Sequence, residues 1–372
     1  MPPTVISSSA ASPAAIDVDP LTDDFRRSIT QTLDAFVDAK QAELAAVGDD
    51  LAPLLEMARS AVSGGKRLRP AFVYWGWRAG GGNPAKAEPI LAAAAAIELV
   101  HASALVHDDV MDDSATRRGL PAAHHRFGQL RRLAVDASAA DRFGRSAAIL
   151  LGDLLLSWSD ELLYASGLRP KPLARGRVYF DRLRTEVVAG QYLDVLAQTS
   201  LRSTAADAMR VLRYKSAKYT VERPLQFGAA IAKSPAALLG ALSSYGIPLG
   251  EAFQLRDDVL GVFGESRVTG KPSGDDIREG KRTLLVARAF DQASPQQADV
   301  LRRHLGRVDV DAAGVHAVQD VLRQTGALAA VETVIAELTS ASLLALRHAP
   351  ITSAEAREAL RVLSDRATRR TD

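Results

Sequence analysis

The sequence contains no cysteine, so neither disulfide bonds nor thiolate metal sites are available to it. Aromatic residues make up only 5% of the 372 residues, and the apolar residues are largely Ala and Leu, which favour helices over strands. Charge of one sign is not in excess, because 46 basic and 44 acidic residues give a formal net charge of +2. A nucleic-acid-binding protein normally needs a basic excess on one face, so we expect no nucleic-acid partner.

Long uninterrupted apolar runs are missing as well. The longest, Ile90 to Val106, is broken by Glu98 and His101. It is shorter than a comfortable membrane span, so we expect a buried helix and no stable membrane insertion. Residues 1–20 mix Pro, Ser and Ala and lack the basic start and continuous apolar stretch of a signal peptide. We therefore expect a disordered leader over residues 1–20 and a cytoplasmic protein.

The rest of the chain, residues 21–372, has the pattern of one all-α domain. Alternating β-branched runs are nearly absent, and no linker divides the chain. Two segments depart from a helical pattern: residues 129–145, which we expect to be a surface insertion, and 264–280, which we expect to be a mobile loop. The helices that we expect cover residues 25–46, 84–113 (with Asn83 as the cap), 147–166, 172–197, 205–232, 235–262, 280–293, 296–307, 310–326 and 329–347.

The most informative segment is the acidic end of the long helix, where Asp108, Asp109, Asp112 and Asp113 follow one another closely. On a helix, Asp108 and Asp112 project from the same face. Carboxylates that line a cavity wall behind an apolar helix repel each other and need a counter-ion. Oxygen-only ligands favour a hard cation such as Mg²⁺. A lone acidic pair of this kind is more often a solvated helix end, so the interpretation depends on what accompanies it.

A second acidic pair, Asp257-Asp258, ends another apolar helix. Two carboxylate groups on separate helices could hold a polyanion through shared metals, as is expected where a diphosphate must leave. Cations accompany both groups: Lys66 and Arg69 follow a Gly pair, Arg117 and Arg118 follow the first acidic group, and Lys215, Lys218, Lys271 and Lys281 lie further on. Each feature alone is also typical of an exposed helix end, but together they indicate a diphosphate site.

In their order and spacing, these segments resemble the trans-isoprenyl diphosphate synthases, the polyprenyl synthetase family. The resemblance covers roughly residues 51–285 and implies the isoprenoid synthase fold, a helical bundle around a central apolar cavity. The matching motifs are GGKRLRP (64–70), HASALVHDDVMDDSATRRG (101–119), GDLLL (152–156), GQYLD (190–194), YKSAKYT (214–220), QLRDD (254–258) and GKPSGDDIREGKRT (270–283).

The resemblance also implies roles for individual residues. Lys66, Arg69, His101 and Arg118 would hold isopentenyl diphosphate. Asp108 and Asp112, supported by Asp109, would bind two Mg²⁺ ions shared with the allylic diphosphate, and Asp257 would bind the last of about three per active site. Arg117 would contact the allylic diphosphate, Lys215, Lys271 and Lys281 would contact the leaving group, and Ser216 and Gln254 would lie near the carbocation. The family also implies a homodimer.

One position departs from the family pattern. The second motif usually reads DDxxD, whereas its last position here is Gly261. Only the first aspartate need touch a metal, so we expect activity to survive, and the nearby Asp275-Asp276 pair is a candidate replacement.

Product length in the family depends on the bulk that precedes the first aspartate. Ser103 and Ala104 are small, and the first motif lacks the two-residue insertion common in bacterial farnesyl diphosphate synthases. We therefore expect a geranylgeranyl diphosphate synthase (C20 product), which accepts dimethylallyl, geranyl and farnesyl diphosphates as allylic substrates. Farnesyl or C25-and-longer products remain alternatives.

Two other functions fit parts of the pattern. A class I terpene cyclase shares the fold and the first acidic motif, but would carry an Asn/Ser/Glu metal motif and would not need GGKRLRP. A non-catalytic regulatory subunit of a prenyl synthase should have lost metal aspartates, and here the first set is intact. Activity of the purified chain alone distinguishes an enzyme from such a subunit.

Overall fold

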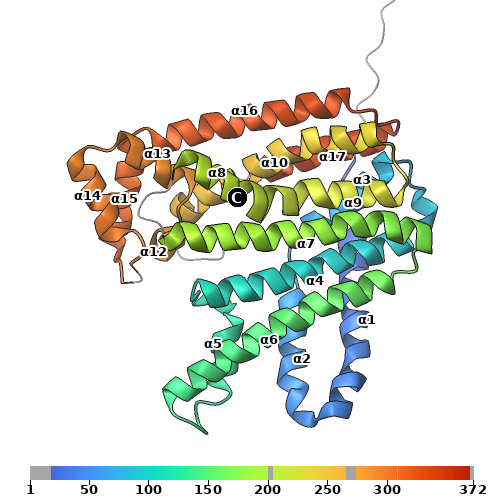
Figure 1. Cartoon of the computed structure of the whole chain (residues 1–372), viewed down its shortest axis with the longest axis horizontal. Coiled ribbons are helices and arrows are strands. Elements are labelled where there is room, and N and C mark those ends of the chain that lie inside the picture. Colours follow the sequence, from blue (N-terminus) through green and yellow to red (C-terminus); the bar gives the residue numbers. More distant parts are fainter. Residues whose placement is uncertain (1–17, 200–203, 265–273, 308, 369–372) are drawn as a thin grey trace, which may run out of the picture.

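The computed structural model describes residues 18–199, 204–264, 274–307 and 309–368, which are almost entirely helical (Figure 1). The all-α prediction is therefore confirmed, whereas most of the predicted leader and Lys271 lie outside the described residues. The α-helices are α1 (Asp23–Val47), α2 (Ala52–Val62), α3 (Leu68–Ala79), α4 (Glu88–Met111), α5 (Ala123–Gln129), α6 (Ala137–Tyr164), α7 (Pro170–Thr199), α8 (Ala205–Leu212), α9 (Arg223–Ile231), α10 (Ala236–Phe263), α12 (Asp275–Glu279), α13 (Leu284–Gln292), α14 (Pro295–His304), α15 (Ala312–Gln324), α16 (Ala327–His348) and α17 (Ala354–Thr368).

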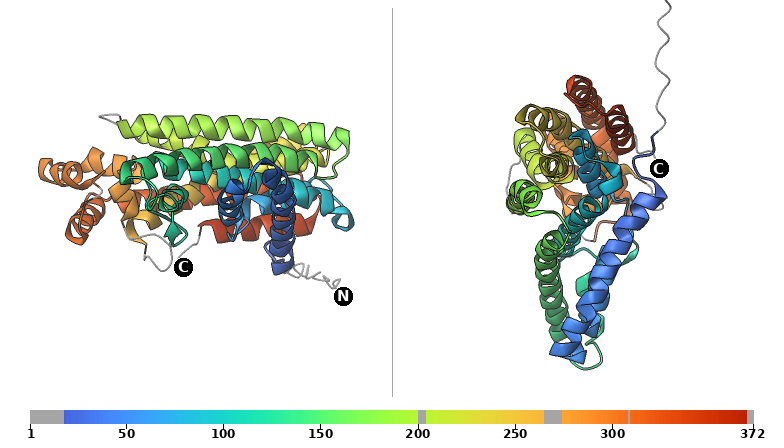
Figure 2. Two further views of the ribbon diagram at one scale, coloured as in Figure 1. Left: turned by 90° about the horizontal axis from the view of Figure 1, so that it is seen from below. Right: turned by 90° about the vertical axis from the view of Figure 1, so that its right-hand side faces the viewer.

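Helix α4 lies in the middle of the bundle. Its residues from Ala93 to Val100 are all buried, and it packs against α3 and α6. Helix α10 packs against α16 on one side and against residues 213–222 on another. Figures 1 and 2 show α1, α2, α5 and the first part of α6 projecting from one side of this body. The long apolar segment is thus a core helix, as its interrupting charges predicted.

Two helices of the described chain are long and apolar enough to span a membrane by length and composition alone. They are α4, in which 67% of the most apolar window is buried inside the protein, and α16, in which 22% is buried. Burial of α4 explains its apolar composition without a membrane.

Five helices, α2, α3, α5, α12 and α17, lie outside the predicted helical ranges, and other helices begin at a different residue than expected. Asn83 caps a short 3-10 turn, Pro84–Lys86, and α4 begins only at Glu88 and ends at Met111. In the segment 129–145, predicted to be a surface insertion, residues 129–138 are exposed, and α6 begins at Ala137. Asp136 caps that helix through a bond from the Ala139 amide, a local signal that the prediction missed.

The predicted helix over residues 205–232 is continuous but not regular. Between α8 and α9 the chain forms a π-helix, η3 (Arg213–Glu222). Such wide turns inside helices are frequent at functional sites. Here the π-helix brings Lys215, Ser216 and Tyr219 to the same cavity.

A two-stranded hairpin follows α4. Strands β1 (Thr116–Arg117) and β2 (Leu120–Pro121) pair antiparallel, with Thr116 opposite Pro121. The hairpin is too short to give a strand signal in the sequence, yet it carries both arginines of the predicted site. Arg118 adopts φ 53°, which turns the chain sharply between the strands.

Candidate active site

Most of the predicted site residues line one cavity of about 600 Å³. Its walls come from α4, α7, η3, α10, the hairpin and the segment before α3. The predicted residues that line it are Lys66, Arg69, His101, Asp108, Arg117, Arg118, Lys215, Ser216, Gln254, Asp257 and Lys281. Two predicted residues, Asp109 and Asp112, lie beside the cavity without lining it.

Asp108 is held by donors from two other elements. Its Oδ1 accepts hydrogen bonds from Lys215 Nζ at 3.0 Å and from Gln191 Nε2 at 2.9 Å. Lys215 also donates to Asp194 Oδ2 at 2.6 Å, so the lysine bridges η3, α4 and α7. Burial alone would raise the pKa of Asp108, but the nearby Lys215 and Lys281 outweigh it and hold this pKa below its ordinary value. Asp108 is therefore ionised at neutral pH.

Asp112 lies one helical turn after Asp108 and caps the end of α4. Its Oδ1 accepts a weak hydrogen bond from Gln198 Nε2 at 3.4 Å. Burial, followed by the charge of Asp108, raises the pKa of Asp112 to about 6. The two carboxylates on this face thus repel each other, and a cation between them would relieve the repulsion.

Asp109 points into the protein and is only 2% exposed. It accepts hydrogen bonds from Arg117, whose Nε lies 2.9 Å from Oδ1 and 3.1 Å from Oδ2. A bidentate pair of this kind fixes the orientation of a guanidinium group. The geometry therefore favours a role for Asp109 in orienting Arg117.

The second acidic group is assembled from two segments. Asp257 and Asp258 lie in the last two turns of α10, and Asp276 comes from α12. A Cβ atom at Gly261 would lie 2.0 Å from Asp276 Oδ2, so the carboxylate fills the space beside this glycine. Burial, followed by the charge of Asp276, raises the pKa of Asp258 to about 7. Lys281 Nζ lies 2.9 Å from Asp276 Oδ1 and partly balances this charge.

The opposite end of the cavity is basic. Among the described residues, Arg69 and Arg118 form no ion pair: Arg69 donates to Thr220 Oγ1 at 3.0 Å, and Arg118 donates to the Ser63 carbonyl oxygen. Arg67, by contrast, is buried and paired with Glu98 at 2.8 Å. Cations that have no acidic partner at a cavity wall are suited to bind an anion.

His101 lies at this basic end. Burial, with the charges of Arg69 and Arg118 next, lowers the pKa of His101 well below its ordinary value. Its Nδ1 lies 3.1 Å from the Tyr219 hydroxyl, whose own pKa burial raises. Because the hydroxyl therefore keeps its proton, it can donate to Nδ1, which leaves the Nε2 proton of a neutral imidazole for a ligand.

The sequence prediction missed several polar residues of the site. Gln191 and Asp194 lie within the GQYLD motif, and Tyr219 lies within YKSAKYT, but none was assigned a role of its own. The sequence of a long helix does not indicate whether a polar side chain faces solvent or a carboxylate of another helix. Only the packing of α7 and η3 against α4 identifies these residues.

Comparison with known proteins agrees with this geometry. The family model described as polyprenyl synthetase matches residues 52–322. A short chain isoprenyl diphosphate synthase of Methanothermobacter thermautotrophicus is 34% identical over 66% of this chain and 70% of its own length. A geranylgeranyl diphosphate synthase of Mycobacterium tuberculosis is 32% identical over 73% of this chain and 71% of its own.

A solved structure is similar over nearly the whole chain. It is a geranylgeranyl pyrophosphate synthase of Corynebacterium glutamicum, complexed with isoprenyl diphosphate and magnesium. The TM-score is 0.90 at 40% identity, and the match covers 94% of this chain and 99% of that one. The fold is therefore the isoprenoid synthase fold, and the resemblance predicted from the motifs is confirmed. This chain belongs to the polyprenyl synthetase family.

Proposed function

We propose that this protein is a magnesium-dependent prenyltransferase that joins an allylic diphosphate to isopentenyl diphosphate and makes geranylgeranyl diphosphate. The observation that carries the proposal is that one cavity is lined by the carboxylates Asp108 and Asp257 and also by a basic group around His101, which lies two helical turns before Asp108 on α4. A diphosphate that departs as a leaving group needs metal ions to neutralise its charge, whereas a diphosphate that is only bound needs basic side chains. The names of the relatives, several of them geranylgeranyl diphosphate synthases, support the same activity and product class.

The acidic end fits Mg²⁺, because it offers carboxylate oxygens from α4 and α10. Burial, followed by the charge of Asp108, raises the pKa of Asp112, and a bound cation would relieve this repulsion. Asp108 and Asp112 would hold two ions and Asp257 a third, about three per active site. Bound Mg²⁺ would neutralise the diphosphate so that it can leave. Relatives support this choice, since one solved family member is complexed with magnesium and another with calcium.

The basic end would hold isopentenyl diphosphate through Lys66, Arg69, His101 and Arg118. In the neutral tautomer favoured by Tyr219, His101 donates one hydrogen bond from Nε2 without adding a further positive charge. Arg69 lies over the Tyr219 ring, 4.6 Å from its centre, which limits the motion of both side chains. The anion would therefore meet a site whose donors are already oriented.

The reaction needs no general base on the protein. As the allylic C–O bond breaks, Lys215 and Lys281 stabilise the departing diphosphate, and Lys271 is expected to join them. The double bond of isopentenyl diphosphate then attacks the carbocation, and a proton passes to the released diphosphate. Ser216 and Gln254, which line the cavity, would lie near the carbocation, and the apolar lining residues Val187, Leu212 and Phe253 would exclude water from it.

Asp276 would supply the carboxylate that the DDxxD pattern of the family has at position 261, where this chain has glycine. Its carboxylate occupies the space where a side chain at 261 would begin, and it is close enough to Asp258 to raise that pKa. The second acidic group would thus keep a third carboxylate, which explains how activity survives the departure from the DDxxD pattern.

Product length would depend on α4. Ala104 lines the cavity one turn before Asp108, whereas Ser103 is buried outside its lining. Ala104→Phe should therefore shorten the product directly, and Ser103→Phe should do so by displacing its neighbours. Unchanged product length in both variants would show that the end of the cavity lies elsewhere.

We also infer a cytoplasmic homodimer, without stable membrane insertion. Apolar side chains that are largely exposed lie along α6 and α7, among them Leu150 (63%), Val188 (64%) and Tyr192 (69%). Exposed apolar side chains along adjacent helices are typical of a subunit interface. Light scattering of the wild type and of Val188→Arg tests this, since the variant should shift the mass toward that of a monomer.

The decisive experiment assays the purified chain alone. It is incubated with labelled isopentenyl diphosphate and each of dimethylallyl, geranyl and farnesyl diphosphate, with Mg²⁺ or with a chelator. We expect C20 diphosphate with Mg²⁺ and none with the chelator. A hydrocarbon made without isopentenyl diphosphate would indicate a cyclase, and elongation only with a partner would indicate a regulatory subunit.

A further inference from the structure

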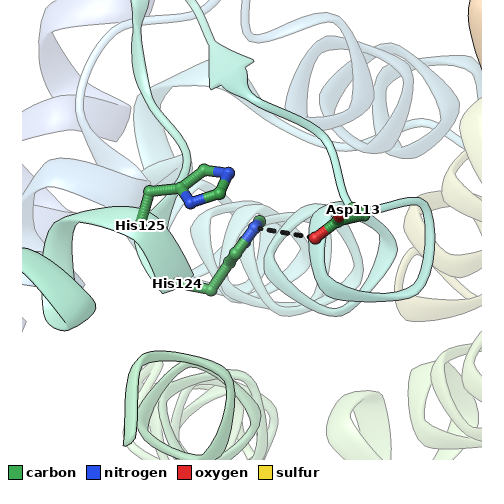
Figure 3. A group of neighbouring side chains, drawn as sticks. All are labelled: Asp113, His124 and His125. Carbon is green, nitrogen blue, oxygen red and sulfur yellow. Dashed lines mark ion pairs between the residues drawn. The ribbon is translucent and has the colours of Figure 1, made fainter. Parts of the chain in front are cut away.

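Three side chains outside the cavity form a separate cluster at the two ends of the hairpin (Figure 3). Asp113 follows the last turn of α4, and His124 and His125 lie in the first turn of α5. Each offers one ligand atom, and these atoms all lie within 4.8 Å of one another. None of the three lines the cavity.

His124 has an environment that is unusual for a buried imidazole. Its side chain is 3% exposed, and neither ring nitrogen has a hydrogen-bond partner within the described chain. Its Nε2 points toward Asp113 Oδ1 but lies 3.7 Å away, beyond hydrogen-bond distance (Figure 3). A buried polar group that lacks partners is costly, so this ring nitrogen favours a ligand, an ion or a water molecule, that the described residues do not supply.

The donor set fits a transition-metal ion of the zinc class. His125 stacks beside His124 with ring centres 4.0 Å apart, so two imidazoles and one carboxylate converge. Two ligands about 2.0–2.1 Å from a tetrahedral ion are roughly 3.4 Å apart. The 3.7 Å separation of His124 Nε2 and Asp113 Oδ1 is close to that spacing. Imidazole nitrogen favours Zn²⁺, whereas the carboxylates of the cavity favour Mg²⁺.

The backbone that carries these ligands is firmly held. A Cβ atom at Gly144 would lie 2.2 Å from the His124 carbonyl oxygen, so α5 and α6 are in direct backbone contact at this point. On the other side, Asp113 adopts φ 51°, and the next amide, of Ser114, donates to the Asp109 carbonyl at 2.9 Å. Only the side chains would need to move to bind an ion.

We propose that Asp113, His124 and His125 form a second metal site that binds one Zn²⁺-class ion, with water as its fourth ligand. Because the ligands lie just before and just after the hairpin, a bound ion would link the two ends of the segment that carries Arg117 and Arg118. The ion would thereby restrict the positions of these two arginines. Ion binding itself does not depend on the proposed prenyltransferase activity.

The test uses the full-length, tag-free chain with Asp108→Asn and Asp112→Asn, which removes carboxylates that would compete for divalent ions. Co²⁺ serves as a visible probe for Zn²⁺. We expect one equivalent to give the intense absorption of four-coordinate cobalt with nitrogen ligands, and equimolar Zn²⁺ to abolish it. Carboxylate-only sites would give the weak spectrum of six-coordinate cobalt.

His125→Gln in the same background is the decisive variant, because His125 is partly exposed and its loss should leave the fold intact. We expect at least ten-fold weaker Zn²⁺ binding by calorimetry and loss of the intense band. His124→Gln should do the same, and His316→Gln, which alters an exposed histidine on α15, should change neither. Absence of the band in the parent, or its persistence in both His124→Gln and His125→Gln, would overturn the proposal.

Discussion

The two acidic groups that we propose to bind Mg²⁺ differ in which segments supply their carboxylates. On α4, Asp108 and Asp112 come from one helix, four residues apart, so helical periodicity alone puts them on one face. Near α10, the carboxylates come from two segments, and Gly261 leaves room for Asp276 from α12. The first group is therefore encoded locally, and the second exists only when α10 and α12 pack together.

The two groups also differ in the charge state of their aspartates. Asp108 is stabilised in its charged form by Lys215, which Asp194 holds from the other side. Asp258 is buried next to Asp276, and its pKa rises to about 7. Asp108 is thus charged before any ion arrives, whereas Asp258 is partly protonated at neutral pH, and a bound metal would displace that proton.

The largest effect is expected at the first group. Asp108→Asn removes the α4 carboxylate that pairs with Lys215 and lines the cavity, so we expect kcat to fall by roughly 10³-fold or more. Steady-state assays with Mg²⁺ check this. Asp153→Asn on the exposed part of α6 is the matched control and should retain activity. A small loss for Asp108→Asn would mean that the α10 group carries the metals.

The next largest effect is expected when the carboxylate of the second group is moved between positions 261 and 276. Gly261→Asp alone should destabilise the protein, because its Cβ would lie 2.0 Å from Asp276 Oδ2. Asp276→Gly alone should lower kcat by roughly 10- to 100-fold, since one oxyanion or metal contact is lost. The double variant should recover stability and part of the activity. Melting temperatures and kcat of the three variants test this, and additive losses in the double variant would show that the two positions do not exchange roles.

The larger pH effect on stability is expected at Asp258, because its pKa rises to about 7 whereas that of Asp112 rises to about 6. The pKa of Asp258 is about 7 in the folded protein and 3.8 for the ordinary group, so the folded state binds the proton more tightly between these values. This contribution to stability is present at low pH and is lost as pH rises through 7. In chelator, the melting temperature of wild type relative to Asp258→Asn should fall by a few degrees, on the order of 2–4 °C, between pH 5 and 8.

Thermal unfolding at the two pH values gives the measurement. Asp320→Asn serves as its control, because this carboxylate is exposed on α15 and does not line the cavity. A constant difference between wild type and Asp258→Asn would show that Asp258 is ionised in the folded protein throughout this range.

The smallest effects should come from the glutamines that donate to each group. Gln191 donates to Asp108 and Gln254 donates to Asp258, each at 2.9 Å. Truncation of either to Ala removes one hydrogen bond to a carboxylate, worth about 1.5–3 kcal/mol when the acceptor is charged. Because Asp108 is fully charged at neutral pH and Asp258 is only partly charged, Gln191→Ala should raise the Mg²⁺ concentration for half-maximal activity more than Gln254→Ala. Mg²⁺ titrations of both variants measure the ratio, and equal shifts would contradict the difference between the two groups.

Much of the fold could be read from local sequence. The Ala-rich stretch and the start signals predicted most of the helices, and the bounds of α7, α10 and α16 lie within a few residues of the expectation. The errors occurred where a local signal was weak or was overridden. The polar residues 137–145 became the start of α6 because that helix packs on α5 and α4, and no single-residue propensity reports such packing.

The sequence by itself determined the helical class, the spacing of Asp108 and Asp112, and the family, because these depend on residue order and helical period alone. Tertiary structure decided what those residues touch. It turned Asp109 toward Arg117, brought Lys215 and Gln191 to Asp108 and filled the space beside Gly261 with Asp276. It also gathered Asp113, His124 and His125 into one cluster. Apart from the short span between Asp109 and Arg117, each of these contacts joins different helices, and packing rather than periodicity sets the distance between them.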